Sequence, residues 1–154
     1  MEDSWWLKMI LSHGGDTEVE DNVDSIDLMW GQTPIYKAIK THKSENVELL
    51  IKAGANLNHQ DYIGVTPVMK ASAYRDYKSV YQMLQAGADW QFKMPNGFDL
   101  AISCVSFPID NPNQFPERYQ YYQKVLQFLD EKGVDWEAAK KYVNNSNRKI
   151  GELY

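Results

Sequence analysis

The chain has 154 residues, the size of one ordinary domain with a continuous core, and leaves no room for a second domain. A net charge of −5 argues against a nucleic-acid surface, which needs clustered Lys and Arg, and favours basic partners. A single cysteine, Cys104, cannot form an internal disulfide, so we expect it to act as a small apolar residue within a helix.

The first predicted element is a short helix from Trp6 that ends near Gly14. An acidic loop, 16–27, follows and contains no Lys or Arg; its carboxylates are Asp16, Glu18, Glu20, Asp21, Asp24 and Asp27. Two interpretations stay open: a solvated surface loop, or a docking site that steers a basic partner electrostatically. A calcium loop is not expected, because the last three acids are spaced by three residues and the turn glycine is missing.

Two successive segments, 28–60 and 61–93, share two motifs at one spacing. Gly31-Gln32-Thr33-Pro34 returns as Gly64-Val65-Thr66-Pro67 (64 − 31 = 33), and Ala53-Gly54-Ala55-Asn56 returns as Ala86-Gly87-Ala88-Asp89 (87 − 54 = 33). In each unit the Thr can cap a helix that has the Pro in its first turn, and the later Gly can end a second helix. A shared period of this size predicts stacked repeats.

These motifs resemble the ankyrin repeat, in which a Gly-x-Thr-Pro turn precedes two short helices and an extended tip. The resemblance implies an all-α solenoid of about four to five helix-turn-helix units, occupying 1–154 as one domain, in which each repeat buries its apolar face against its neighbours. Residues 4–18 then correspond to a half repeat whose first helix is missing. We therefore expect either a leader and half a repeat upstream of this chain, or an internal start at Met1.

The fourth repeat, 94–135, starts its turn at Gly97 (97 − 64 = 33), with Asp99 in place of the capping Thr. An insertion at 106–120 contains Pro108, Pro112 and Pro116 and is predicted to be a protruding, non-helical loop. Two roles stay open for it: folding back over the last repeat, or reaching a partner. Residues 136–154 are predicted to form a C-terminal cap, with a helix over 136–143 and a polar, poorly ordered tail.

The residue pattern offers no catalytic constellation. It contains no nucleophile elbow, no phosphate-cradling glycine loop and no His-Glu-x-x-His helix. The three histidines, His13, His42 and His59, are predicted to be surface or capping residues. We therefore expect a protein that is not an enzyme and that needs no cofactor, metal or small-molecule substrate.

In ankyrin-type solenoids, the tips and the inner faces of the first helices line a concave surface that usually binds protein. Aromatic residues and Arg at these positions are expected to anchor a partner. The resemblance, together with the inserted loop, gives these predicted partner-binding residues: Met29, Trp30, Gln32, Lys40, Thr41, Tyr62, Ile63, Val65, Tyr74, Arg75, Asn96, Phe98, Phe107 and Phe115. For Trp30 and Phe98 the alternative is packing against neighbouring tips.

Residues 66–84, Thr-Pro-Val-Met-Lys-Ala-Ser-Ala-Tyr-Arg-Asp-Tyr-Lys-Ser-Val-Tyr-Gln-Met-Leu, and the segment 124–134 resemble short bacterial ankyrin proteins encoded beside type VI secretion lipase or phospholipase effectors. The resemblance implies an immunity protein that occludes the active site of its effector. It also implies a periplasmic location, with a lipid anchor upstream of this chain as the only membrane contact. The alternative is a cytoplasmic scaffold or adaptor that binds other proteins.

Overall fold

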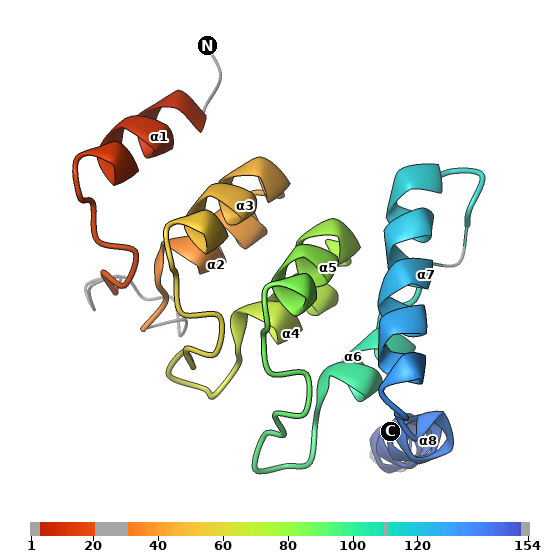
Figure 1. The fold of residues 1–154 in the computed structure, drawn as a ribbon. Coiled ribbons are helices and arrows are strands. Elements are labelled where there is room, and N and C mark those ends of the chain that lie inside the picture. The colour runs from red at the N-terminus through yellow and green to blue at the C-terminus, as the bar shows by residue number, and fades with distance from the viewer. Residues whose placement is uncertain (1–3, 21–30, 110, 152–154) are drawn as a thin grey trace.

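The computed structural model describes residues 4–20, 31–109 and 111–151, with side chains up to residue 146. In these ranges the chain forms eight helices that stack into a solenoid (Figure 1). They are α1 (Ser4–Ser12), α2 (Pro34–Lys40), α3 (Ser44–Lys52), α4 (Pro67–Ala73), α5 (Tyr77–Gln85), α6 (Leu100–Ser106), α7 (Pro116–Glu131) and α8 (Trp136–Gly151). The described residues contain no named strand, only one isolated bridge between Lys93 and Asp99. The predicted all-α solenoid is confirmed.

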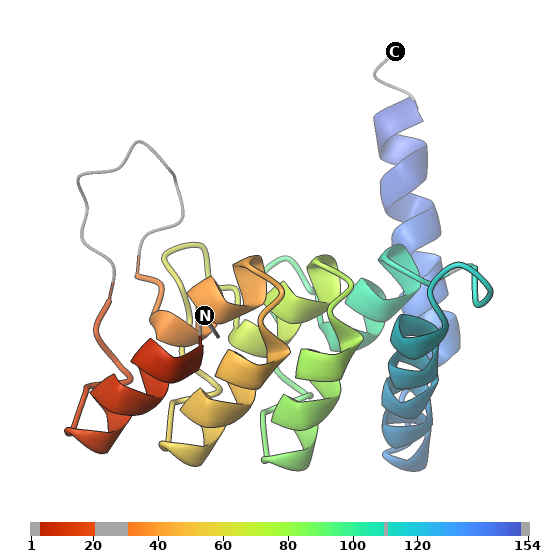
Figure 2. The same ribbon diagram turned by 90° about the horizontal axis from the view of Figure 1, so that it is seen from above.

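The helices form two rows that run along the solenoid. The inner row consists of α2, α4 and α6, and the outer row consists of α1, α3, α5 and α7 (Figure 2). Within a repeat, α2 packs on α3 and α4 packs on α5, while the contacts between repeats join α2 with α4, α4 with α6, and α3 with α5. None of the described helices is both long and apolar enough to cross a bilayer.

The core lies between the two rows, where each helix buries apolar side chains against its neighbours. Its largest fully buried side chains are Ile35, Tyr36, Ile39, Val47, Leu50, Val68, Tyr77, Val80, Met83, Leu100, Val125 and Leu129. Cys104 is also buried in this cluster, within α6, as the sequence predicts. Every repeat therefore depends on the next one for part of its core, as expected for a stack of repeats.

The starts of the inner helices correct one prediction about capping. Thr33 and Thr66 stand at the N-cap positions of α2 and α4 with extended backbone, but neither side chain makes a capping hydrogen bond. Pro at the first helical position removes one amide that would need a partner, which makes such a cap less necessary. Asp99 does cap α6, because its carboxylate accepts from the Ile102 amide at 2.9 Å.

The outer helices end at glycines, as the sequence predicts. Gly54 and Gly87 follow α3 and α5 with φ of +87° and +92°, a region that glycine enters without steric cost. The amide of the following residue then reaches back to the helix: Ala55 donates to the Leu50 carbonyl and Ala88 to the Met83 carbonyl, both at 3.0 Å. These glycines turn the chain out of the outer row toward the next tip.

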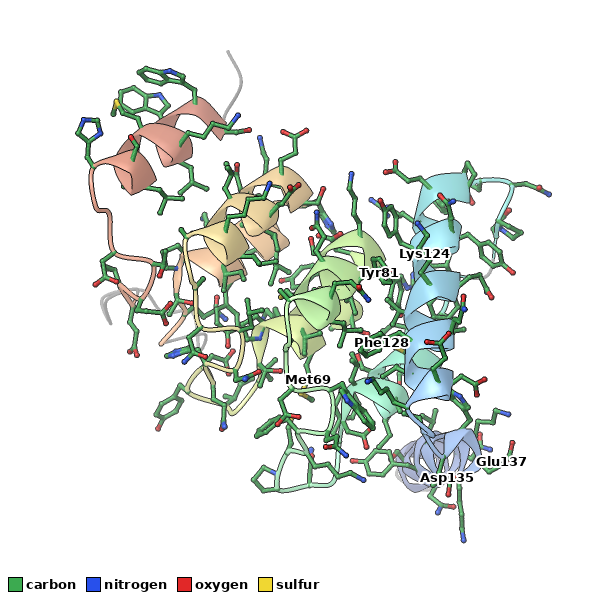
Figure 3. All side chains as sticks on the ribbon, in the orientation of Figure 1. Met69, Tyr81, Lys124, Phe128, Asp135 and Glu137 are labelled. Atoms are coloured by element: carbon green, nitrogen blue, oxygen red, sulfur yellow. The ribbon has the colours of Figure 1, made fainter. Side chains whose placement is uncertain are left out.

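The inserted segment 106–120 is only partly a loop, so the prediction of a fully non-helical insertion is wrong. The helix α6 ends at Ser106, and α7 already begins at Pro116. Pro116 starts this helix because the first helical position tolerates its fixed φ and missing amide hydrogen. Lys124 of α7 points toward Tyr81 of α5, with 5.6 Å between the ammonium nitrogen and the ring centre, and so helps to hold α7 on the outer row (Figure 3).

The C-terminal helix is longer than predicted. The sequence predicts a helix over 136–143 with a tail, whereas α8 continues to Gly151. Asn144, Asn145 and Ser146 are weak helix formers, but no Pro or Gly interrupts the helix before its end. It packs on α6 and extends past the inner row, on the side away from the outer helices (Figure 2). It therefore forms a wall at one end of the inner face.

Candidate partner-binding surface

The tip between the second and third repeats presents two large apolar side chains to solvent. Tyr62 is 76% exposed and Ile63 is 53% exposed. Asp61, which is buried, holds this turn by accepting from the amides of Ile63 at 3.2 Å and Val65 at 2.9 Å. The turn is thus fixed from inside while its two apolar residues face outward, an arrangement suited to binding a protein partner.

Gln32 belongs to the support of this tip. It is 9% exposed, and its amide donates to the Asp61 carboxylate at 3.2 Å. Its side chain is therefore held inside the protein rather than offered to a partner. Val65 is half-buried and packs against the core, and its carbonyl accepts from the Tyr36 hydroxyl at 2.7 Å.

The ends of the inner helices carry the second group of predicted residues. Lys40 and Thr41 are exposed at the end of α2, and Arg75 is exposed just after α4. Tyr74 is half-buried, and its ring lies 6.0 Å from the His42 ring of the preceding repeat, edge to face. These side chains come from two successive repeats, which the contact between the Tyr74 and His42 rings joins at this point.

In the fourth repeat, α8 covers part of the expected inner face. The Tyr142 hydroxyl donates to the Asn96 carbonyl at 3.2 Å, and the Tyr142 ring lies 6.3 Å from the Phe98 ring. A pocket of about 460 Å³ remains between this tip and α8. Asn96 and Phe98 thus contact Tyr142 of α8, whereas the sequence-based alternative for Phe98 is packing against neighbouring tips.

The inserted loop is anchored at its start and exposed at its end. The carbonyl of Phe107 accepts from the Tyr77 hydroxyl at 2.6 Å, and Ile109 is only 7% exposed. Phe115, just before α7, is 41% exposed, with the guanidinium of Arg118 5.5 Å from its ring centre. The first part of the loop folds back on the repeats, and the second part is accessible to a partner.

The described part of the acidic loop contacts residues 56–59, which follow α3. Glu18 accepts from the Asn56 amide at 2.9 Å, and Glu20 lies 3.7 Å from the His59 ring. The Asp16 carboxylate accepts from the Glu18 amide at 2.8 Å. Of the predicted residues, Asp21, Asp24, Asp27, Met29 and Trp30 lie outside the described residues.

The residues with catalytic potential are dispersed. Among the residues that the structure describes, no three His, Cys, Asp or Glu side chains come together in a way that would hold a metal ion. Burial raises the pKa of the Cys104 thiol to about 12, which keeps it protonated and a poor nucleophile near neutral pH. His13 and His59 contact the backbone carbonyls of Met9 and Gly31, respectively.

Comparison with known proteins assigns the fold to a family. Residues 3–94, more than half of the chain, match the family model for ankyrin repeats (3 copies). The chain belongs to the ankyrin repeat family. Ankyrin repeats are interaction modules that bind proteins, typically as scaffolds without a catalytic site of their own.

The chain is similar to two longer proteins that contain ankyrin repeats. The chain is 30% identical over 81 residues to the B-cell lymphoma 3 protein homolog of Mus musculus, which covers 53% of this chain and 17% of the relative. It is 25% identical, with a TM-score of 0.53, to the crystal structure of the ankyrin repeat domain of Bcl-3, a unique member of the IkappaB protein family; the match covers 63% of this chain and 40% of that one. The chain spans less than half the length of either.

Proposed function

We propose that this ankyrin-repeat chain binds one folded protein partner through its inner face. The observation that carries the proposal is the placement of Tyr62 and Ile63 on one tip, and of Tyr74 and Arg75 at the end of the inner helix α4 that follows it, with the two tip residues largely exposed. Tyr and Arg, together with Trp, are enriched among the residues that contribute most to interface energies.

For the partner itself, we propose a secreted antibacterial lipase or phospholipase, with this chain as its immunity protein. The resemblance of residues 66–84 to such immunity proteins supports this assignment. The chain would act by occlusion: the inner face, with α8 at one end, covers the entrance to the active site, and the exposed Phe115 of the inserted loop adds a further contact. This role requires no chemistry from the chain itself, and it would place the protein in the periplasm behind a lipoprotein leader.

The second candidate is a cytoplasmic scaffold or regulatory adaptor. The similarity to the Bcl-3 ankyrin repeat domain favours it, because that structure is described as a member of the IkappaB protein family rather than as an inhibitor of a secreted enzyme. Both candidates use the same surface, and they differ in the number and kind of partners.

Affinity capture from a lysate of the native organism, followed by mass spectrometry, separates the two candidates. One secreted hydrolase retained in a near stoichiometric amount supports the immunity role, while several cytoplasmic proteins support the adaptor. The double substitution Tyr62→Ala/Ile63→Ala should weaken capture of the true partner by roughly tenfold or more. Gln85→Ala, an exposed change at the end of α5, is the matched control and should leave capture unchanged. Undiminished capture by the tip variant would move the interface off the inner face.

A further inference from the structure

The inner row carries positive charge although the chain as a whole is acidic. The helices α2, α4 and α6 contain Lys37, Lys40 and Lys70 and no Asp or Glu, while the chain has a net charge of −5. The turns after α2 and α4 add His42 and Arg75. Positive charge is thus concentrated on one edge of the inner face.

We use the name basic rim for five residues at the ends of α2 and α4: Lys40, His42, Lys70, Tyr74 and Arg75. Tyr74 lies at its centre, with the Lys70 ammonium nitrogen 5.7 Å from its ring centre on one side and the His42 ring 6.0 Å away on the other. Burial lowers the pKa of Lys70, and the charge of Lys40 lowers it further. The nearby Asp61 carboxylate acts in the opposite direction.

The two exposed cations of the basic rim, Lys40 and Arg75, differ from four lysines outside the inner row that pair with carboxylates. These pairs are Lys52 with Glu48, Lys78 with Glu117, Lys93 with Asp99 and Lys140 with Glu137. Across the residues that the structure describes, no carboxylate comes within ion-pair distance of Lys40 or Arg75. The neighbouring Asp76 is buried and accepts from the amide and hydroxyl of Ser79, so it caps α5 instead of pairing with Arg75.

Two of the rim residues sit on strained backbone. His42 and Arg75 have φ of +53° and +56°, a region that favours glycine. A side chain at such a position costs on the order of 1 kcal/mol or more, and strain of this kind concentrates at functional sites. The turn recurs in two successive repeats, and each time it presents a cationic or titratable side chain.

We propose that the basic rim binds an acidic segment of the protein partner. The carboxylates of this segment pair with Lys40 and Arg75, and an apolar side chain of the same segment packs on Tyr74. The proposal deepens the proposed function, because it uses the same inner face and rests on that face being the binding surface. An acidic peptide is favoured over a nucleic acid, because the net charge of −5 opposes a long polyanion while the rim attracts a short one.

The test uses a fluorescein-labelled peptide of alternating Glu and Ser, with its Gln–Ser counterpart, in anisotropy titrations at low and moderate salt. Wild type should bind the Glu peptide more tightly than the Gln peptide, and the difference should shrink with salt. Lys40→Ala/Arg75→Gly should weaken binding of the Glu peptide roughly tenfold without lowering the Tm, since Gly relieves the strain at position 75. Lys8→Ala/Lys52→Ala removes the same charge from exposed sites on α1 and α3 and should have little effect.

Arg75→Lys provides a second check, because it keeps the charge and should retain most of the affinity for the Glu peptide. Equal binding of the Glu and Gln peptides, or equal losses in the rim and control variants, would overturn the proposal. Tighter binding of a single-stranded oligonucleotide than of the Glu peptide would also overturn it and assign the rim to phosphates. If capture of the partner is lost in Tyr62→Ala/Ile63→Ala but unaffected in Lys40→Ala/Arg75→Gly, the proposed function stands and only the acidic assignment fails.

Discussion

His42 and Arg75 occupy equivalent positions one repeat apart (75 − 42 = 33), with φ of +53° and +56°. Each amide donates to a carbonyl of the preceding inner helix, His42 to Ile39 at 3.0 Å and Arg75 to Ser72 at 2.9 Å. The left-handed turn is therefore imposed by the repeat, and not by the side chain that occupies it. Glycine would adopt the same conformation without steric cost.

Replacing His42 by Gly should stabilise the protein. The left-handed conformation costs a residue with a Cβ atom about 1–2 kcal/mol, part of which Gly gives back through the greater entropy of its unfolded chain. We expect a net gain of roughly 0.5–1 kcal/mol in the free energy of unfolding, measured by urea denaturation. His42→Ala is the control, since it removes the imidazole but keeps the strain, and it should give no gain. A lower stability for His42→Gly would mean that the ring contact with Tyr74 outweighs the strain.

The second prediction concerns the tip that Asp61 supports. Asp61→Ala removes the acceptor for the amides of Ile63 and Val65 and for the Gln32 side chain. Because the Gln32 amide group is buried and the two backbone amides are partly buried, the loss should cost about 2–3 kcal/mol of unfolding free energy. Asp61→Asn, which keeps one acceptor oxygen, should cost less. Thermal denaturation of both variants checks the order, and equal stability of Asp61→Ala and wild type would contradict the assigned role of this carboxylate.

The features set by local chemistry could be predicted from the sequence. The 33-residue spacing locates the repeats, Gly54 and Gly87 end outer helices, and Asp99 caps α6. In each case one residue type has a conformational or hydrogen-bonding property that the turn needs, so the residue alone is informative. The absence of Asp and Glu from the inner helices is also visible in the sequence. It draws attention to Lys70 and His42, which the predicted set of partner-binding residues omits.

The features set by tertiary contacts could not be predicted in this way. Pro116 begins α7 although proline also breaks helices, and only the packing of α7 on α5 decides between the two outcomes. The contact of Tyr142 with Asn96 joins residues 46 positions apart. It depends on the direction in which α8 leaves the turn at Gly133, and no local pattern specifies that direction.

The third prediction is a pH dependence of stability that arises at Cys104. Burial raises the pKa of this thiol from 9.0 to about 12, so the unfolded chain loses the proton first as the pH rises. The contribution of the thiol to stability is therefore complete below pH 9 and is lost between pH 9 and 12, at up to about 1.4 kcal/mol per pH unit. Cys104→Ala lacks this group, so its stability deficit relative to wild type should shrink across that range.

Urea denaturation of wild type and Cys104→Ala at several pH values measures this difference. Burial also raises the pKa of Tyr36, which lowers alkaline stability in both proteins and cancels in the comparison. Burial raises the pKa of Tyr77 as well, and Cys104 adds to this shift, so the measured difference includes the coupling between the thiol and Tyr77. A constant difference from neutral pH to pH 12 would show that the thiol titrates alike in the folded and unfolded chains.

The fourth prediction separates the two ends of the inserted loop. Ile109 is buried, so Ile109→Ala should cost about 2 kcal/mol or more of unfolding free energy. Phe115 is 41% exposed and its ring contacts Arg118, so Phe115→Ala should cost less than Ile109→Ala, about 1 kcal/mol. In a binding assay with the captured partner the order should reverse: Phe115→Ala weakens binding, because the exposed ring at the start of α7 is available to a partner. If Phe115→Ala destabilises the fold as much as Ile109→Ala does, both ends of the loop serve the core, and the exposed end has no separate role in recognition.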